Sequence, residues 1–203
     1  EPILEAAEAY LAEARRTELG AIVHWGPEHP LGGPRQVWVD SLFMFGMYFV
    51  ARSGEPGFLE RWAEQYRAFS THCRDPGDQL YRHAWDEDEA LNIPEEATYW
   101  ARGNSWVLVS AAAALREAGP GTLADIEALF VAQAGATRAL QTPSGLWRTV
   151  LNSPEGEDPA NYEETSASAL IAWSFAVGLR EGLLDESFRP SLDAAVAGLL
   201  GRI

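Results

Sequence analysis

The chain has 203 residues, 47% of them hydrophobic, which is enough for one globular domain with a sizeable core. Its 30 acidic residues against 15 basic ones give a formal net charge of −15, which argues against nucleic acid or an anionic membrane surface as a partner. The lone Cys73 excludes an internal disulfide framework and a cysteine-rich zinc site. We therefore expect a single domain over residues 1–203.

Apolar residues recur at helical spacing in several runs that Gly and Pro residues separate. A further segment, Gly145–Asn152, predicts either a strand or an extended loop. In chain order the runs predict about seven helices, at Pro2–Glu18, Ser41–Ser53, Pro56–Cys73, Ser105–Ala118, Thr122–Leu140, Thr165–Glu181 and Glu186–Arg202.

These predicted helices alternate in character. The second, fourth and sixth are apolar on most sides, which is typical of buried helices, whereas the third, fifth and seventh carry a charged face. This alternation predicts helical hairpins in two layers. Polar residues precede or begin the buried helices at intervals of about sixty residues, which predicts an all-α, α/α-toroid fold with a site at one mouth.

The most apolar window, Val37–Val50, is too short to cross a bilayer, and no signal peptide is visible. We therefore expect no membrane partner and a cytoplasmic location.

Asp40 is the single charged residue in that apolar window. It is either only the N-cap of the second helix or a capping residue that also serves in an active site. Apolar neighbours such as Trp38 and Phe43 would raise its proton affinity, as a general acid requires. Asn104 likewise has two interpretations, as a helix cap or as a ligand-binding residue.

The run from Asp86 to Glu89 is strongly acidic, which is typical of a solvated face. Here it follows His83 and Trp85, which favours a site. A magnesium cluster is a weak alternative because no phosphate-binding segment accompanies the run, and we expect no metal or cofactor.

Eight tryptophans are many for this length, and aromatic faces are the surfaces on which sugar rings stack. Trp100, Trp106 and Trp147 are candidates, with plain core packing as the alternative. His24 and Trp25 are further candidates, in a stretch rich in Pro and Gly that is typical of a loop. Together with carboxylates, His and Arg, these tryptophans favour a carbohydrate site.

Five ordered segments resemble the unsaturated glucuronyl and rhamnogalacturonyl hydrolases: WVDSLFM (38–44), HAWDED (83–88), WARGNSW (100–106), GLW (145–147) and YEETSASA (162–169). The resemblance implies an (α/α)6 barrel of six helical hairpins. It also implies removal of a 4,5-unsaturated uronic acid from the non-reducing end of an oligosaccharide left by a polysaccharide lyase, without attack at the anomeric carbon. In the mechanism that the resemblance implies, an aspartic acid protonates C4 of the vinyl ether, and a water that the same group deprotonates adds at C5.

Carried over by motif, the resemblance makes Asp40 a catalytic residue and places a second acid between His83 and the RGN segment. That interval offers Asp86 and Asp88, of which Asp86 is slightly favoured. The implied substrate-binding residues are His83, Trp85, Trp100, Arg102, Asn104, Trp106, Trp147, Arg148 and Glu164.

About seven helices are fewer than the twelve of a complete barrel. The chain is therefore expected to form a partial toroid with an apolar edge, through which copies associate. Two alternatives to a hydrolase remain: a non-catalytic carbohydrate-binding or scaffold relative of the same fold, and a different toroid enzyme such as a terpenoid cyclase. The latter requires a basic diphosphate site, which the sequence lacks.

Overall fold

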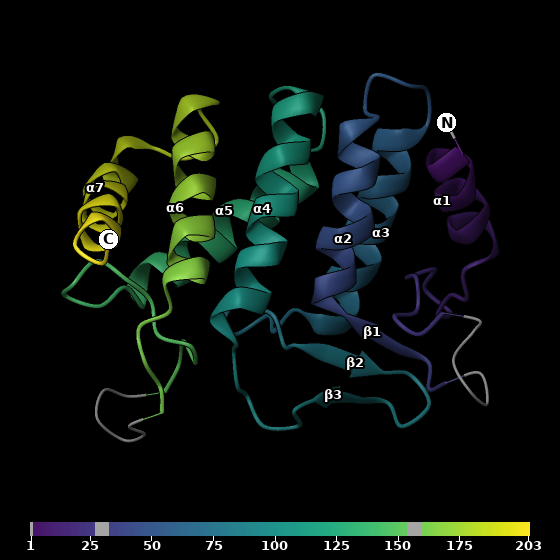
Figure 1. The fold of residues 1–203 in the computed structure, drawn as a ribbon, viewed down its shortest axis with the longest axis horizontal. Helices are drawn as coiled ribbons and strands as arrows, with labels where there is room; N and C mark the ends of the chain where they lie inside the picture. Colours follow the sequence, from purple (N-terminus) through teal and green to yellow (C-terminus); the bar gives the residue numbers. More distant parts are fainter. Residues whose placement is uncertain (1, 27–32, 154–159) are drawn as a thin grey trace.

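The computed structural model describes residues 2–26, 33–153 and 160–203, and this part of the chain is mostly helical (Figure 1). The predicted helical fold is confirmed. Its helices are α1 (Pro2–Glu13), α2 (Val39–Ala51), α3 (Phe58–Cys73), α4 (Ala101–Ala118), α5 (Ala124–Ala139), α6 (Thr165–Arg180) and α7 (Arg189–Leu200).

Helices α2, α4 and α6 form an inner row, with α3 and α5 behind them and α1 and α7 at the two ends (Figure 1). The middle helix, α4, packs against both α2 and α6, and its small residues Ala111–Ala114 are fully or almost fully buried. A Cβ added at Gly46 of α2 would lie 2.9 Å from Ser110 Oγ of α4, so glycine permits this close approach. These contacts form the two layers that the alternating helix character predicts.

Several predicted ends were wrong for local reasons. The first helix ends at Glu13 because the chain then turns back on itself, with Gly20 at a φ of +85° and a bridge between Arg16 and Ile22. The last helix is preceded by a separate 3-10 turn, Glu186–Phe188, that the Asp185 side chain caps. The extended-loop alternative holds for 145–152, which makes only isolated bridges to neighbouring segments.

The sequence did not predict the three-stranded antiparallel sheet β1 (Gln36–Trp38), β2 (Ala84–Asp86) and β3 (Leu91–Ile93). Its register pairs Gln36 with Asp86 and Trp38 with Ala84. Strand β1 leads directly into α2, and the sheet lies at the end of the inner row at which the helices begin, next to α2 and α4 (Figure 1). The sheet therefore brings the segment after α3 to the first turn of α2.

Large apolar side chains are exposed on the helices at the C-terminal end of the row, among them Trp173 of α6 and Val196 and Leu200 of α7. They fit the predicted apolar edge, and association of copies through it stays a prediction. None of the helices in the described residues is both long enough and apolar enough to cross a membrane.

Candidate active site

A carboxylate and an imidazole meet where β2 approaches α2. His83 Nε2 lies 2.9 Å from Asp40 Oδ2, and about a quarter of each side chain is exposed to solvent. The backbone N–H of Val39 donates to the carbonyl of His83 at 3.1 Å, which extends the β1–β2 pairing to the start of the helix. Backbone pairing therefore sets the position of this pair.

The capping interpretation of Asp40 was wrong. Helix α2 begins at Val39, its N-cap is Trp38, and no side chain caps it. Asp40 is therefore inside the first turn of the helix, with its carboxylate turned toward His83. The positive end of the helix still lies beside the carboxylate and favours its charged form.

The expected rise in the proton affinity of Asp40 was also wrong. Burial raises the pKa of Asp40, but the hydrogen bond and positive charge of His83, a backbone hydrogen bond and the charge of His24 together lower it below its ordinary value. The resting group is a carboxylate at neutral pH. Hydrogen bonding and nearby cations outweigh the apolar surroundings that the sequence emphasised.

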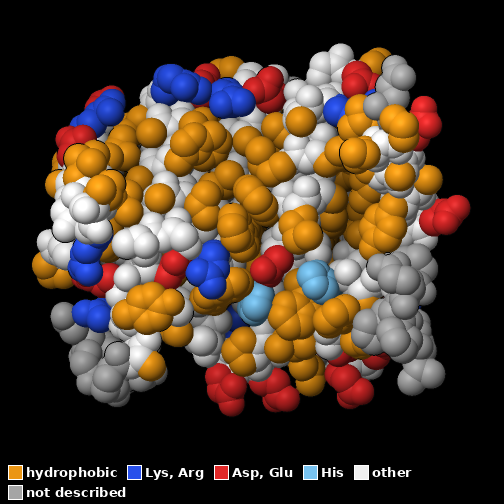
Figure 2. Space-filling view, viewed as in Figure 1, with side chains coloured by type: hydrophobic (Ala, Val, Ile, Leu, Met, Phe, Trp, Pro, Cys, Tyr) orange, Lys and Arg blue, Asp and Glu red, His pale blue; other side chains and the backbone are white. Residues whose placement is uncertain are grey.

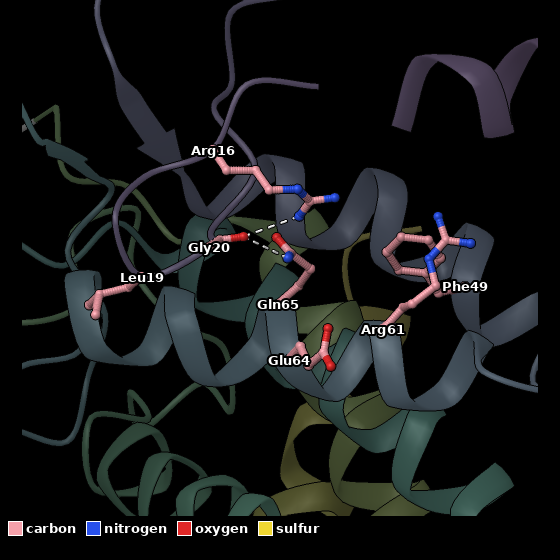
Figure 3. A pocket seen from close by; sticks show the side chains of 7 residues that line it. All are labelled: Arg16, Leu19, Gly20, Phe49, Arg61, Glu64 and Gln65. Carbon is pink, nitrogen blue, oxygen red and sulfur yellow. Dashed lines mark hydrogen bonds between the residues drawn. The ribbon is translucent and has the colours of Figure 1, made fainter. Parts of the chain in front are cut away.

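His24 is the third titratable group of the cluster. Its Nδ1 lies 2.7 Å from Ser41 Oγ, and burial lowers its pKa although the charge of Asp40 opposes the shift. Gln65 of α3 holds the segment that carries His24, because its amide accepts from Ile22 N at 2.8 Å and donates to Gly20 O at 2.9 Å. Figure 3 shows Gln65 and Arg16 converging on the Gly20 carbonyl.

The recess in Figure 3 has a volume of about 310 Å³ and lies on the α3 side of this segment. A second, mostly apolar groove of about 320 Å³ runs between α1 and α2, and His24 and Ser41 form part of its wall. Of these two hollows, the groove is the one whose wall includes a member of the cluster, His24.

Aromatic rings pack against the His83 side of the Asp40–His83 pair. The His83 ring centroid lies 4.7 Å from Trp38 and 4.6 Å from Trp100, while Trp38 also contacts His24 and Trp25. Figure 2 shows two histidines beside an acidic side chain, with hydrophobic side chains around them, on the face that the inner helices form. Apolar ring faces next to ionisable groups are suited to a sugar ring that carries a charge.

Arg102 extends this surface on the α4 side. Its guanidinium carbon lies 4.7 Å from the centroid of the Trp100 ring, and its Nη1 lies 3.2 Å from Glu164 Oε1. More than a third of the Arg102 side chain stays exposed. Glu164 is buried and caps α6, accepting from the backbone N–H groups of Ser166 and Ala167. Glu164 therefore positions Arg102 and has little surface to offer a ligand.

Asp86 and Asp88 are not brought into contact with Asp40. Asp86 is buried, and its two oxygens accept hydrogen bonds from Gln36 Nε2 at 2.8 Å and from the backbone N–H groups of Asp88 and Glu89. Asp88 is exposed and pairs with Arg35 at 2.7 Å. Hydrogen bonds from the backbone N–H and side chain of Arg35 lower the pKa of Asp88. The acidic run thus forms the hairpin turn between β2 and β3.

Four other residues that were predicted to bind substrate mainly contact the protein's own backbone and side chains. Asn104 is fully buried in α4, where its amide bonds both the N–H and the C=O of Tyr81; it does not cap the helix as one interpretation held. Trp147 is fully buried and donates to Thr137 O. Trp85 stacks on His72 at the end of α3, and Arg148 donates to the Asn161 carbonyl.

Trp106 is half-buried and packs on Phe43, with ring centroids 4.5 Å apart, between α4 and α2. The sequence patterns gave no role to Gln36, whose side chain accepts hydrogen bonds from Trp25 and Trp38. Its spacing from Trp38 was a usable signal, because residues two apart on a strand share one face.

The described residues contain no group of three or more His, Cys, Asp or Glu side chains placed to hold a metal ion.

The model of Glycosyl Hydrolase Family 88 matches residues 1–203. The chain belongs to this family. Among its curated relatives is an unsaturated rhamnogalacturonyl hydrolase of Bacillus subtilis, 33% identical over 85% of the chain and 49% of that protein. An unsaturated 3S-rhamnoglycuronyl hydrolase of Formosa agariphila is 30% identical over 78% of the chain and 44% of that protein.

Among solved structures, a possible member of family 105 from Klebsiella pneumoniae superposes with a TM-score of 0.86 and 26% sequence identity. The alignment covers 100% of this family 88 chain and 53% of the other. The chain therefore spans about half the length of these relatives, and its helices correspond to about half of a six-hairpin toroid.

The structure predicts that His83 holds the pKa of Asp40 low. In His83→Leu, the raising effect of burial remains while the hydrogen bond and charge of His83 are lost, so the pKa of Asp40 should rise above its value in the wild type. In the wild type, the low pKa of Asp40 stabilises the folded state above the pH at which an unfolded aspartate titrates, about 3.9. This stabilisation is lost as the pH falls through the pKa of Asp40 in the folded state.

The measurement is an NMR titration of the Asp40 side-chain carboxyl carbon in the wild type and the variant. His72→Leu is the matched control, because His72 contacts Thr17 and Trp85 instead of Asp40. An Asp40 pKa that is equal in wild type and His83→Leu would show that the contact does not control the carboxylate.

Proposed function

We propose that this protein is a hydrolase that removes a 4,5-unsaturated uronic acid from the non-reducing end of oligosaccharides. One observation carries the proposal: the Asp40–His83 pair lies among tryptophan rings and beside an exposed arginine. This combination offers a proton-transfer group, faces for a sugar ring and a cation for a uronate carboxylate. Membership of family 88 and the names of its relatives support the same substrate class.

Asp40 is the proposed proton-transfer group. In the free enzyme it is a carboxylate, so it must gain a proton before it can protonate C4 of the substrate. A bound uronate brings a second negative charge near Asp40, and like charges favour protonation. The approach of the substrate therefore helps to produce the acid form, and the same carboxylate is then able to take a proton from the attacking water.

Arg102 is the proposed partner of the uronate carboxylate. A guanidinium can bind a carboxylate through two hydrogen bonds, and the contacts with Trp100 and Glu164 fix its plane. Trp38 and Trp100, which both contact His83, supply faces for the sugar ring. These roles use groups that start at the N-terminal ends of α2 and α4, where helix dipoles also favour an anion.

Asp40→Asn should remove turnover and largely preserve sugar binding. The amide has nearly the shape of the carboxyl, so the packing of the rings survives, whereas general acid–base catalysis contributes roughly 10²- to 10⁴-fold. The measurement is the loss of double-bond absorbance from an unsaturated uronyl disaccharide, together with its dissociation constant by calorimetry. Asp88→Asn is the control, because Asp88 pairs with Arg35 on the surface.

Full activity in Asp40→Asn would contradict its assignment as the proton-transfer group. A wild type that binds the disaccharide without consuming its double bond would instead support the non-catalytic carbohydrate-binding alternative.

Arg102→Met should raise KM for the unsaturated disaccharide about tenfold or more while kcat changes less, because a bound carboxylate loses a charged hydrogen-bond donor. Arg138→Met is the matched control: Arg138 also lies over an aromatic ring, at 4.1 Å from the Phe188 centroid, but on α5. With a neutral substrate analogue, the methyl ester of the uronate, the KM values of the wild type and Arg102→Met should differ much less. Equal effects of the two arginine variants would remove the case for a uronate contact.

A further inference from the structure

The side chain of Gln36 joins the β-hairpin to the aromatic wall of the site. Its Oε1 accepts hydrogen bonds from two indoles, Trp25 Nε1 and Trp38 Nε1, both at 3.1 Å. Its Nε2 donates to Asp86 Oδ2 at 2.8 Å. One amide thus connects a buried carboxylate with two tryptophans from different segments of the chain.

Hydrogen-bond chemistry fixes the direction of this network. An indole N–H only donates, and an ionised carboxylate only accepts, so the Gln36 oxygen must face the tryptophans and its nitrogen must face Asp86. The other Asp86 oxygen is held by the backbone N–H groups of Asp88 and Glu89, at 3.0 and 3.1 Å. Three donors, the Gln36 amide and two backbone N–H groups, therefore hold the Asp86 carboxylate in place.

Of the two rings that Gln36 holds, Trp38 contacts His83 directly, and Trp25 contacts His24 and Trp38. Trp38 lies edge-to-face with His83, at 4.7 Å between centroids, and it also contacts His24. Trp25 lies edge-to-face with His24 at 5.0 Å. A rotation of the Trp38 ring would therefore change both the ring surface and the support of the imidazole that holds Asp40.

We propose that Gln36 is a positioning residue, oriented by Asp86, that fixes the indoles of Trp25 and Trp38 around the Asp40–His83 pair. Asp86 then acts through Gln36 from the hairpin turn and does not donate the proton. The catalytic consequence rests on the proposed function, whereas the orientation of the two indoles does not. Both oxygens of the Asp86 carboxylate are occupied by hydrogen bonds from Gln36 and from two backbone N–H groups of the hairpin turn, which argues against its being the acid.

Gln36→Met tests the proposal, because methionine has a similar length and no amide. The first readout is the set of indole N–H signals in a ¹H–¹⁵N spectrum, in which Trp25→Phe and Trp38→Phe identify two of the eight tryptophans. Both signals should move upfield and exchange faster with solvent in Gln36→Met, because their acceptor is gone. Gln141→Met is the matched control: it also deletes a bonded amide, which contacts Gly145 O and Ser191 O, and it should leave these two signals in place.

The second readout is steady-state hydrolysis of the unsaturated uronyl disaccharide. Gln36→Met should raise KM about tenfold and lower kcat by less than about tenfold, since Asp40 and His83 are still present and only the support of the imidazole is weakened. Asp86→Asn should give the same division between KM and kcat and move the same two indole signals, because an amide at position 86 cannot accept from three donors at once.

Unmoved Trp25 and Trp38 signals in Gln36→Met would overturn the proposal, whatever the activity. A drop in kcat of about 10²-fold or more in Asp86→Asn with both signals unmoved would also overturn it and make Asp86 the acid. If the wild type shows no turnover, the proposed function fails, and the spectra still decide whether Gln36 orients the indoles.

Discussion

Burial alone would favour a neutral Asp40, and the contact with His83 reverses that preference. A half-buried carboxylate can stay ionised only when hydrogen bonds and positive charge replace the water it has lost. The remaining parts of the site supply these hydrogen bonds and this positive charge, or hold in place the groups that do. The β1–β2 pairing places His83, the first turn of α2 places Asp40, and the rings of Trp38 and Trp100 both pack against the imidazole.

The layered helices explain why these groups meet at one end of the molecule. The inner helices all begin at the end where the small sheet lies, so their first turns and the segments before them share one surface (Figure 1). Close packing of α4 against its neighbours, through alanines and Gly46, fixes the spacing of those first turns. Arg102 and Glu164 come together across α4 and α6 for the same reason.

The helices could be predicted because their apolar residues follow a long, regular period. The sheet could not, since each strand has only three residues and no alternating pattern extends beyond them. Asp40 and Asn104 resembled helix caps, yet their side chains bind His83 and the Tyr81 backbone. Those partners are distant in sequence, and local pattern holds no information about them.

In the acidic run, local pattern predicted a functional role that the fold does not support. The motif suggested a second acid at Asp86, but the fold gives that carboxylate three hydrogen-bond donors in a hairpin turn. Trp147 was similarly a candidate sugar platform from its motif, and the fold buries it completely. Residue type identified the chemistry of the region, whereas the roles of individual side chains depended on pairing between segments.

The most direct test of the account is the fate of the substrate double bond during hydrolysis in D₂O. Proton transfer from Asp40 to C4 predicts a product that has lost the C4–C5 double bond and carries deuterium at C4, observed by NMR as the glycosidic bond is cleaved. A released sugar that retains the double bond would show ordinary attack at the anomeric carbon. That result would contradict the role proposed for the Asp40–His83 pair.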